Sequence, residues 1–104
     1  METQFSRTER ILGREFIERL YSCRVAIFGV GGVGGYVMEA LVRSGIGCID
    51  IVDNDTVALS NLNRQIIATH SNIGENKVDV AEARAKDINP EIIVNKHNVF
   101  YLPN

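Results

Sequence analysis

The chain has 104 residues, which is enough for one small domain and too short for two. Of these residues 45% are hydrophobic and 23% are charged, a composition typical of globular proteins. Its formal net charge of −2 at pH 7 gives no overall attraction for nucleic acid, so a polyanion would have to bind a local patch. The apolar runs are only as long as strands, and the N-terminus carries charges where a signal peptide has its apolar region. We therefore expect a cytoplasmic protein that does not enter a membrane.

Residues 1–22 are expected to form an N-terminal helical segment. Residues 5–22 divide into two helical pieces with a break near Gly13, and the second piece has apolar residues at helical spacing. In the first piece, Arg7 and Arg10 are three positions apart and therefore lie on about the same side of a helix.

The stretch from residue 24 to residue 55 has the layout of a nucleotide-binding crossover. An apolar run at 25–28 predicts a buried strand, and a second run at 49–52 predicts a strand that leads directly into Asp53. Five glycines follow the first strand within seven residues: Gly29, Gly31, Gly32, Gly34 and Gly35. A helical period comes next, with a predicted apolar face made of Val37, Ala40, Leu41 and Ser44.

The rest of the chain contains a long polar loop, a helix and a third strand. Residues 53–73 show no sustained period, and their few apolar residues indicate a functional loop that is pinned to the body of the domain. Helical spacing predicts a helix over 77–88, which Asn89 and Pro90 end. Alternating apolar residues predict a strand over 91–96.

The predicted fold class is α/β, with a Rossmann-like, doubly wound parallel sheet. Right-handed crossovers place the three parallel strands in the spatial order 3-2-1. Residues 23–104 would form only the N-terminal half of such a domain, because no fourth strand is available to pair with the first. We therefore expect a fragment of a longer protein, and the alternative is that a second chain covers this edge.

The glycine turn contains the pattern G-x-G-x-x-G at Gly29, Gly31 and Gly34. These glycines permit a tight turn and let the backbone approach phosphate oxygens, while the N-terminus of the following helix attracts an anion. Asp53 ends the second strand, where a carboxylate can accept hydrogen bonds from a ribose. Taken alone, this pattern favours NAD and a dehydrogenase.

Features outside the simple pattern favour a triphosphate over NAD. The extra Gly32 lets the backbone come closer to a ligand, and the polar loop places Asn61, Arg64 and Gln65 shortly after the acid. Lys77 begins the next helix. A triphosphate has about twice the charge of a dinucleotide's pyrophosphate, and a group of Arg and Lys side chains matches it.

These motifs resemble the ThiF/MoeB/HesA superfamily of ATP-dependent, carboxylate-adenylating enzymes, which includes the ubiquitin-activating enzymes. The resemblance covers residues 7–90. It depends on five motifs: GVGGVG at 29–34, DND at 53–55, SNLNRQ at 60–65, GENK at 74–77 and DINP at 87–90. Three further motifs are most similar to the tRNA threonylcarbamoyladenosine dehydratases (TcdA or CsdL): RTERILG at 7–13, RSGIG at 43–47 and NRQIIA at 63–68.

The resemblance implies a function for individual residues. The nucleotide-binding set would be Gly29, Gly31, Gly32, Gly34, Asp53, Asp55, Asn61, Arg64, Gln65 and Lys77. In this set Asp53 would bind the ribose, and Asp55 would lie near the ribose or a metal. Arg64 and Lys77 would act on the phosphates as catalytic residues. Arg10 would be the third catalytic residue, reaching the active site of a partner subunit.

The activity implied is ATP-dependent adenylation of a carboxylate, with ATP and Mg²⁺ as cofactors. By resemblance, the carboxylate is the threonylcarbamoyl group of a tRNA adenosine, and the enzyme is a homodimer whose main magnesium-binding aspartate lies beyond Asn104. Activation of a ubiquitin-like sulfur-carrier protein is one alternative. An NAD-binding dehydrogenase domain and a nucleotide sensor without turnover are two others.

Overall fold

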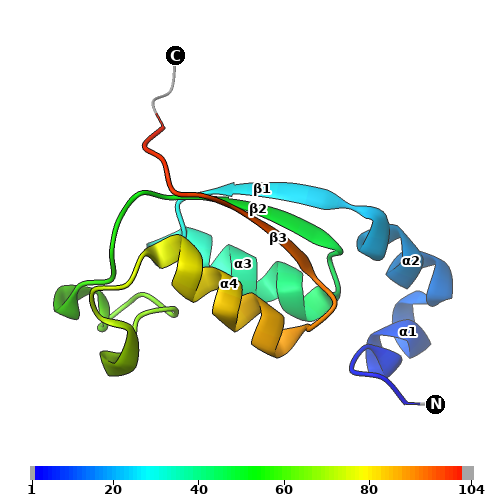
Figure 1. Ribbon diagram of the computed structural model, residues 1–104. Helices are drawn as coiled ribbons and strands as arrows, with labels where there is room; N and C mark the ends of the chain where they lie inside the picture. Colours follow the sequence, from blue (N-terminus) through cyan, green and yellow to red (C-terminus); the bar gives the residue numbers. More distant parts are fainter. Residues whose placement is uncertain (1, 102–104) are drawn as a thin grey trace.

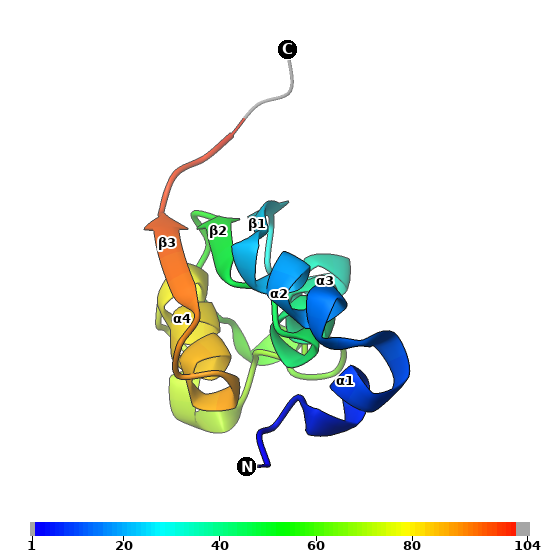
Figure 2. The ribbon, with the colours of Figure 1, turned by 90° about the vertical axis from the view of Figure 1, so that its right-hand side faces the viewer.

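The computed structural model describes residues 2–101 and has the predicted α/β fold (Figures 1 and 2). The elements in chain order are α1 (Ser6–Leu12), α2 (Arg14–Ser22), β1 (Arg24–Phe28), α3 (Gly32–Ser44), β2 (Cys48–Val52), the 3₁₀ turns η1 (Leu59–Asn61) and η2 (His70–Asn72), α4 (Lys77–Ile88) and β3 (Ile93–His97). The break at Gly13 and the bounds of α4 agree with the predictions, whereas β3 lies further along the chain than the predicted 91–96. The predicted domain limits at residues 1 and 104 fall outside the described residues.

The three strands are parallel and lie in the order β1-β2-β3, as predicted. Their register aligns the last residues of the strands, with Phe28 opposite Val52 and Val52 opposite His97. Both α3 and α4 cover the same face of the sheet (Figure 1). The glycine turn and the long loop therefore begin at the same end of the sheet, where the strands have their carboxyl ends.

The hydrophobic core lies between this sheet face and the two helices. Its largest fully buried side chains include Ile49 and Ile51 from β2, and Met38 and Val42 from α3. The apolar face predicted for α3 was wrong except at Leu41, which packs partly buried against the core. Val37 is 43% exposed, and the buried positions of α3 are Gly35, Met38, Glu39 and Val42. The side of α3 that faces the core therefore differs from the predicted side.

A buried carboxylate on α3 explains why the sequence predicted the wrong buried face. Glu39 is only 9% exposed, and Arg84 of α4 donates to both of its carboxylate oxygens at 2.7 and 2.9 Å. Arg43 donates to it from the next turn of α3 at 3.0 Å. The hydrogen bonds from Arg84 lower the pKa of Glu39. Sequence periodicity treats a glutamate as a surface residue, so it selected the wrong face.

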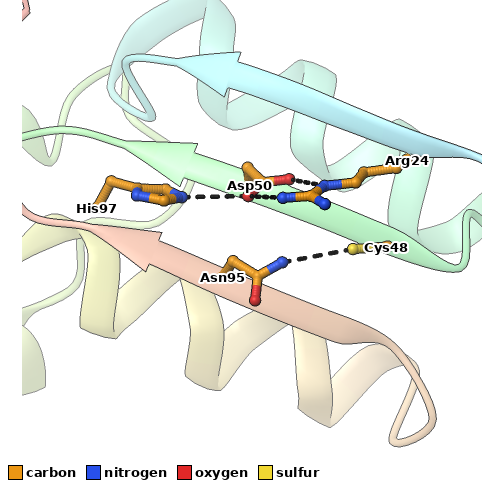
Figure 3. A network of polar contacts seen from close by, with 5 residues as sticks. All are labelled: Arg24, Cys48, Asp50, Asn95 and His97. Carbon is orange, nitrogen blue, oxygen red and sulfur yellow. Dashed lines mark hydrogen bonds and ion pairs between the residues drawn. The ribbon is translucent and has the colours of Figure 1, made fainter.

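The opposite sheet face has a polar network instead of a helix layer among the described residues (Figure 3). Asp50, at the centre of β2, accepts hydrogen bonds from Arg24 Nε and Nη2 at 2.6 and 2.8 Å. Its Oδ1 atom also lies 3.1 Å from Nε2 of His97 on β3. In β1 the edge that faces away from β2 has no strand partner in the described part of the chain, as predicted.

In residues 2–101 none of the helices combines the length and the apolar character needed to span a membrane.

Candidate functional site

The turn between β1 and α3 is the centre of the candidate site. Gly29 has a φ angle of 86°, in the left-handed region that favours glycine, and it directs the chain out of β1. A Cβ atom on Gly34 would lie 1.6 Å from the carbonyl oxygen of Gly29, so only glycine permits this close packing of α3. Gly32, the first residue of α3, is different because, apart from its chain neighbours and the backbone of its own helix, no described atom lies within 4 Å of where its Cβ would be. The first turn of α3 is therefore open, and its unpaired N–H groups suit an anion.

Asp53 joins this turn to the loop that follows β2. Its Oδ2 atom accepts the backbone N–H of Val30 at 3.0 Å, and its Oδ1 atom accepts the N–H of Asp55 at 2.8 Å. The residue is 9% exposed. Each carboxylate oxygen has a second lone pair, so these two bonds still leave acceptor capacity for a ribose, the function that the sequence predicts for Asp53.

The long loop is pinned to the domain, as the sequence predicted. Val57 is 2% exposed and Ile67 is 1% exposed. The two ends of the loop also pair with each other, because the N–H of Val57 donates to the carbonyl oxygen of Glu75 at 2.9 Å and the N–H of Gly74 donates to Val57 at 2.8 Å. The loop is therefore a fixed part of the site.

Asn61 and Arg64 lie in this loop and help to shape it. The Asn61 side chain accepts the backbone N–H of Ala58 at 2.8 Å. In Arg64, Nη1 donates to the carbonyl oxygen of Ser60 at 3.0 Å and to the Asn63 side chain at 2.8 Å. The Arg64 side chain is exposed, and its guanidinium has further donors that can bind a phosphate.

Gln65 and Ile66 place the loop directly on the first turns of α3. The Gln65 side-chain nitrogen lies 3.1 Å from the position of a Cβ atom on Gly31, and Ile66 Cγ2 lies 3.2 Å from that position on Gly35. Gln65 is 9% exposed, and its Oε1 atom is the one buried side-chain polar atom without a hydrogen-bond partner among the described residues.

Lys77 and Asp55 complete the site at the start of α4. Lys77 is 6% exposed, and its Nζ atom lies 3.9 Å from Oδ2 of Asp55. The backbones also pair, since the N–H of Lys77 donates to the carbonyl oxygen of Asp55 at 2.9 Å. The Asp55 side chain is 68% exposed. Residues 2–101 contain no cluster of three or more His, Cys, Asp or Glu side chains arranged to hold a metal, so Asp55 supplies a single carboxylate here.

Arg10 is the predicted site residue that the fold does not bring to the carboxyl ends of the strands. It belongs to α1, which packs beside α2 at the amino ends of the strands (Figure 1). The contacts around α1 agree, because Gln4 donates to the carbonyl oxygen of Ile88 at 3.0 Å and the Phe5 ring approaches Gly45. The strands have five residues each, so roughly 16 Å separates the amino ends of the strands from their carboxyl ends.

Sequence reasoning missed the part played by Val30. Its backbone N–H binds Asp53 and so fixes the glycine turn against the loop after β2. A backbone donor has no residue-type signature, so the only signal available was the position of Asp53 at the end of a strand beside the turn.

Comparisons with known proteins agree on one family. A model of the ThiF family matches residues 5–101. The tRNA threonylcarbamoyladenosine dehydratase of Bacillus subtilis is 50% identical over 98 residues, which is 94% of this chain and 39% of that protein. The sulfur carrier protein adenylyltransferase of Thermus thermophilus is 39% identical over 88 residues, covering 85% of this chain and 32% of that protein.

The solved structures include the tRNA N6-threonylcarbamoyladenosine dehydratase TcdA of Escherichia coli in complex with ATP. It is 38% identical, superposes with a TM-score of 0.92, and is matched over 96% of this chain and 41% of its own. The same enzyme in complex with AMP also gives a TM-score of 0.92. The chain thus spans about two fifths of the length of these two dehydratases. From its sequence motifs, its fold and these matches, the chain belongs to the ThiF family.

Proposed function

We propose that this chain forms the nucleotide-binding part of an enzyme that uses ATP to adenylate a carboxylate. The observation that supports it best is an unbroken series of contacts from the glycine turn to Lys77. Val30 binds Asp53, Asp53 binds the backbone of Asp55, and the Asp55 carboxylate lies 3.9 Å from Lys77. The series joins an open helix N-terminus to a buried lysine, two features that both favour phosphate.

In this reaction a carboxylate oxygen attacks the α-phosphorus of ATP and pyrophosphate leaves. The carboxylate is already a nucleophile, so the protein contributes positioning and charge neutralisation. Lys77 and Arg64 would bind phosphate oxygens, and the N–H groups at Gly32 would add the helix dipole. Asp53 would bind the ribose hydroxyls with the acceptor capacity that its backbone contacts leave unused.

The proposed substrate is the threonylcarbamoyl carboxylate on a tRNA adenosine, which adenylation activates so that intramolecular attack forms the cyclic product and releases AMP. The support is the 50% identity to the Bacillus subtilis dehydratase and the 0.92 TM-score to the Escherichia coli enzyme. The second candidate is the C-terminal carboxylate of a ubiquitin-like sulfur carrier, which the 39% identity to the Thermus thermophilus adenylyltransferase supports. ThiF membership favours both over an NAD-dependent dehydrogenase.

Magnesium is part of this proposal as a companion of ATP. Mg²⁺ usually binds one or two carboxylates together with substrate phosphates and keeps several waters. Asp55 fits one such carboxylate because its side chain is 68% exposed at the site edge. When bound, the ion would offset part of the phosphate charge.

The proposed assembly is a homodimer in which Arg10 acts on the partner's nucleotide. Arg10 lies with α1 at the amino ends of the strands, while Lys77 lies at their carboxyl ends. We infer that an arginine so far from the site of its own chain reaches phosphates in a second copy. A C2 dimer supplies both sites equally.

ATP–pyrophosphate exchange by the full-length protein tests the proposed activity, with threonylcarbamoyladenosine-containing tRNA or a sulfur carrier as the carboxylate. Arg64→Ala and Lys77→Ala should each reduce exchange by about 10²-fold, comparable to losing one donor at a developing charge. Lys86→Ala and Arg14→Ala are matched controls, since both side chains are exposed and each pairs with a glutamate one turn away. These controls should stay within about twofold of the wild type.

Unchanged exchange in both site variants would contradict the assignment. ATP binding by the wild type with neither carboxylate supporting exchange would instead favour a nucleotide sensor. The carboxylate that supports exchange decides between the two proposed substrates.

A further inference from the structure

The sheet face that carries Arg24, Asp50 and His97, called the polar face below, is not used by the proposed function. It lies opposite α3 and α4 (Figure 3). All-parallel sheets occur almost only with both faces covered by other elements. Among residues 2–101 the polar face has no helix layer, so we expect an element outside these residues to cover it.

The Asp50 carboxylate is already paired in the way that a buried charge requires. Its side chain is 10% exposed, and Arg24 donates to both of its oxygen atoms. His97 Nε2 lies 3.1 Å from Oδ1 of the same carboxylate. An ion pair that is open to water adds little stability, whereas a charge that is buried needs its partners in place. The network therefore suits a face that is covered in the full-length protein.

Apolar side chains on the polar face remain exposed around this network. Phe28 is 58% exposed, and Ala26 is also exposed. Together with Val52 and Val99 they line an open hollow of about 600 Å³ that extends across the three strands. Burying such apolar surface is favourable. The polar face therefore fits an occupant with apolar residues for the hollow and an acceptor oxygen for the donors of Arg24 that Asp50 leaves unused.

The chain after β3 turns toward β1 (Figure 2). The Tyr101 ring packs edge-on against Phe28, with the ring centroids 5.1 Å apart. Its Oη atom lies 3.8 Å from where a Cβ atom on Gly29 would be. Because β2 lies between β3 and β1, residues 98–101 bring this ring across the carboxyl ends of the strands. This direction is opposite to that of the two earlier connections, which run from β1 to β2 and from β2 to β3.

The handedness of strand connections determines which face a returning segment covers. Connections between parallel strands of one sheet are right-handed in about 98% of cases. The helices α3 and α4 share one face because both of their connections run in the direction from β1 toward β3. A right-handed connection that returns from β3 to the free edge of β1 must therefore pass over the opposite face, which is the polar face.

We propose that the polar face is the docking surface for the segment of this same chain that follows residue 101 in the full-length protein. The two dehydratases compared above are long enough to supply such a segment, because this chain spans only about two fifths of each. The segment places apolar residues over Ala26 and Phe28 and an acceptor oxygen over Arg24. This inference does not depend on the nucleotide proposed for the carboxyl ends of the strands.

Thiol labelling of the full-length protein tests whether the polar face is covered. Ala26→Cys places a small thiol at the middle of β1, at a position that residues 2–101 leave exposed. Lys86→Cys is the matched control, because the Lys86 side chain is 50% exposed on α4. In the native protein the first thiol should react with a maleimide at least about 100-fold more slowly than the second, and in denaturant the rates should be equal.

Peptide mapping by mass spectrometry separates these thiols from the natural Cys23 and Cys48. Equal rates at the two introduced thiols in the native protein would mean that the polar face is open to water, and would overturn the proposal.

Photo-cross-linking identifies the occupant. Benzoylphenylalanine in place of Phe28 has its reactive group on the polar face, and the same amino acid in place of Lys86 is the control. We expect a product that migrates as a single chain and whose cross-linked peptide lies after residue 101. A covalent dimer would assign the polar face to a second copy of the chain, and cross-links confined to residues 2–101 would leave the face without the proposed occupant. Either result would overturn the proposal.

Discussion

Individual side chains at the carboxyl edge of the sheet both fix the loops and face the candidate ligand site. Asp53 uses two oxygen atoms to hold the backbones of Val30 and Asp55. Lys77 is 6% exposed, and its nearest carboxylate, Asp55, is 3.9 Å away and mostly exposed. A buried ammonium group with one distant partner is costly unless another anion balances it. A bound phosphate would supply that anion.

The Asp50 network on the other sheet face gives a prediction for pH dependence. The hydrogen bonds from Arg24, and after them the contact with His97, hold the pKa of Asp50 well below its usual 3.8. A carboxyl group whose pKa is lower when folded adds stability above its unfolded pKa, and that contribution is lost as the pH falls toward the folded value. Asp50→Asn should therefore lower the melting temperature by roughly 5 °C at pH 7. This difference should shrink below about pH 4.

Thermal unfolding of both proteins between pH 7 and pH 3 measures this effect. Asp79→Asn is the control, because Asp79 is 47% exposed and bonds Lys96 at 2.9 Å on the surface, where an ion pair adds little. A difference between wild type and Asp50→Asn that is as large at pH 3 as at pH 7 would contradict the electrostatic origin.

At the scale of elements, the glycine turn contains positions that need glycine for different reasons. Gly34→Ala places a Cβ atom 1.6 Å from a backbone oxygen, so the variant should lose more than about 3 kcal/mol of stability. The Cβ of Gly32→Ala meets no described atom within 4 Å outside its chain neighbours and the backbone of its own helix, so stability should change by less than about 0.5 kcal/mol. Its Cβ would nevertheless occupy the open turn, and ATP affinity should fall about tenfold.

Chemical denaturation and ATP titration of these two variants check this contrast. A stable Gly32→Ala variant with wild-type ATP affinity would place the phosphates elsewhere. An equally stable Gly34→Ala variant would contradict the close packing of α3 on β1.

The elements differ in how well the sequence predicts them. The helix α4 was predicted at its exact bounds, since Val78, Ala81 and Ala85 form a regular apolar stripe and all three are buried. The buried face of α3 could not be predicted because it contains Glu39, whose partner Arg84 is 45 residues away. Periodicity records the polarity of a residue, not the partner that makes its burial favourable.

At the scale of the whole molecule, Arg10 lies at the amino ends of the strands and Lys77 at their carboxyl ends. These positions predict that each active site combines Lys77 of one subunit with Arg10 of the other. Arg10→Ala and Lys77→Ala proteins should each be nearly inactive in exchange when assayed alone. Mixed in equal amounts and allowed to exchange subunits, they should recover about a quarter of wild-type activity, because half of the dimers are mixed and each has one intact site. No recovery despite proven mixing would mean that Arg10 acts within its own chain or not at all.

For the candidate site, the sequence indicated which residues to consider but not how they are arranged. The motifs pointed to Gly32, Asp53 and Lys77, and the parallel strand topology brings these three residues to the carboxyl ends of the strands. The contact of Gln65 with Gly31 could not be predicted, because it depends on how a loop of irregular structure folds back onto α3. The place of Arg10 also required the fold, since α1 has no sequence signal for the edge on which it lies.

The most direct test of the central claim is calorimetric titration of the full-length protein with ATP and with NAD, for the wild type and for Lys77→Ala. An open helix N-terminus acting together with Arg64 and Lys77 should bind ATP at least about tenfold more tightly than NAD. Lys77→Ala should remove most of that preference. Tighter binding of NAD, or an unchanged preference for ATP without Lys77, would contradict the assignment of this edge as a triphosphate site.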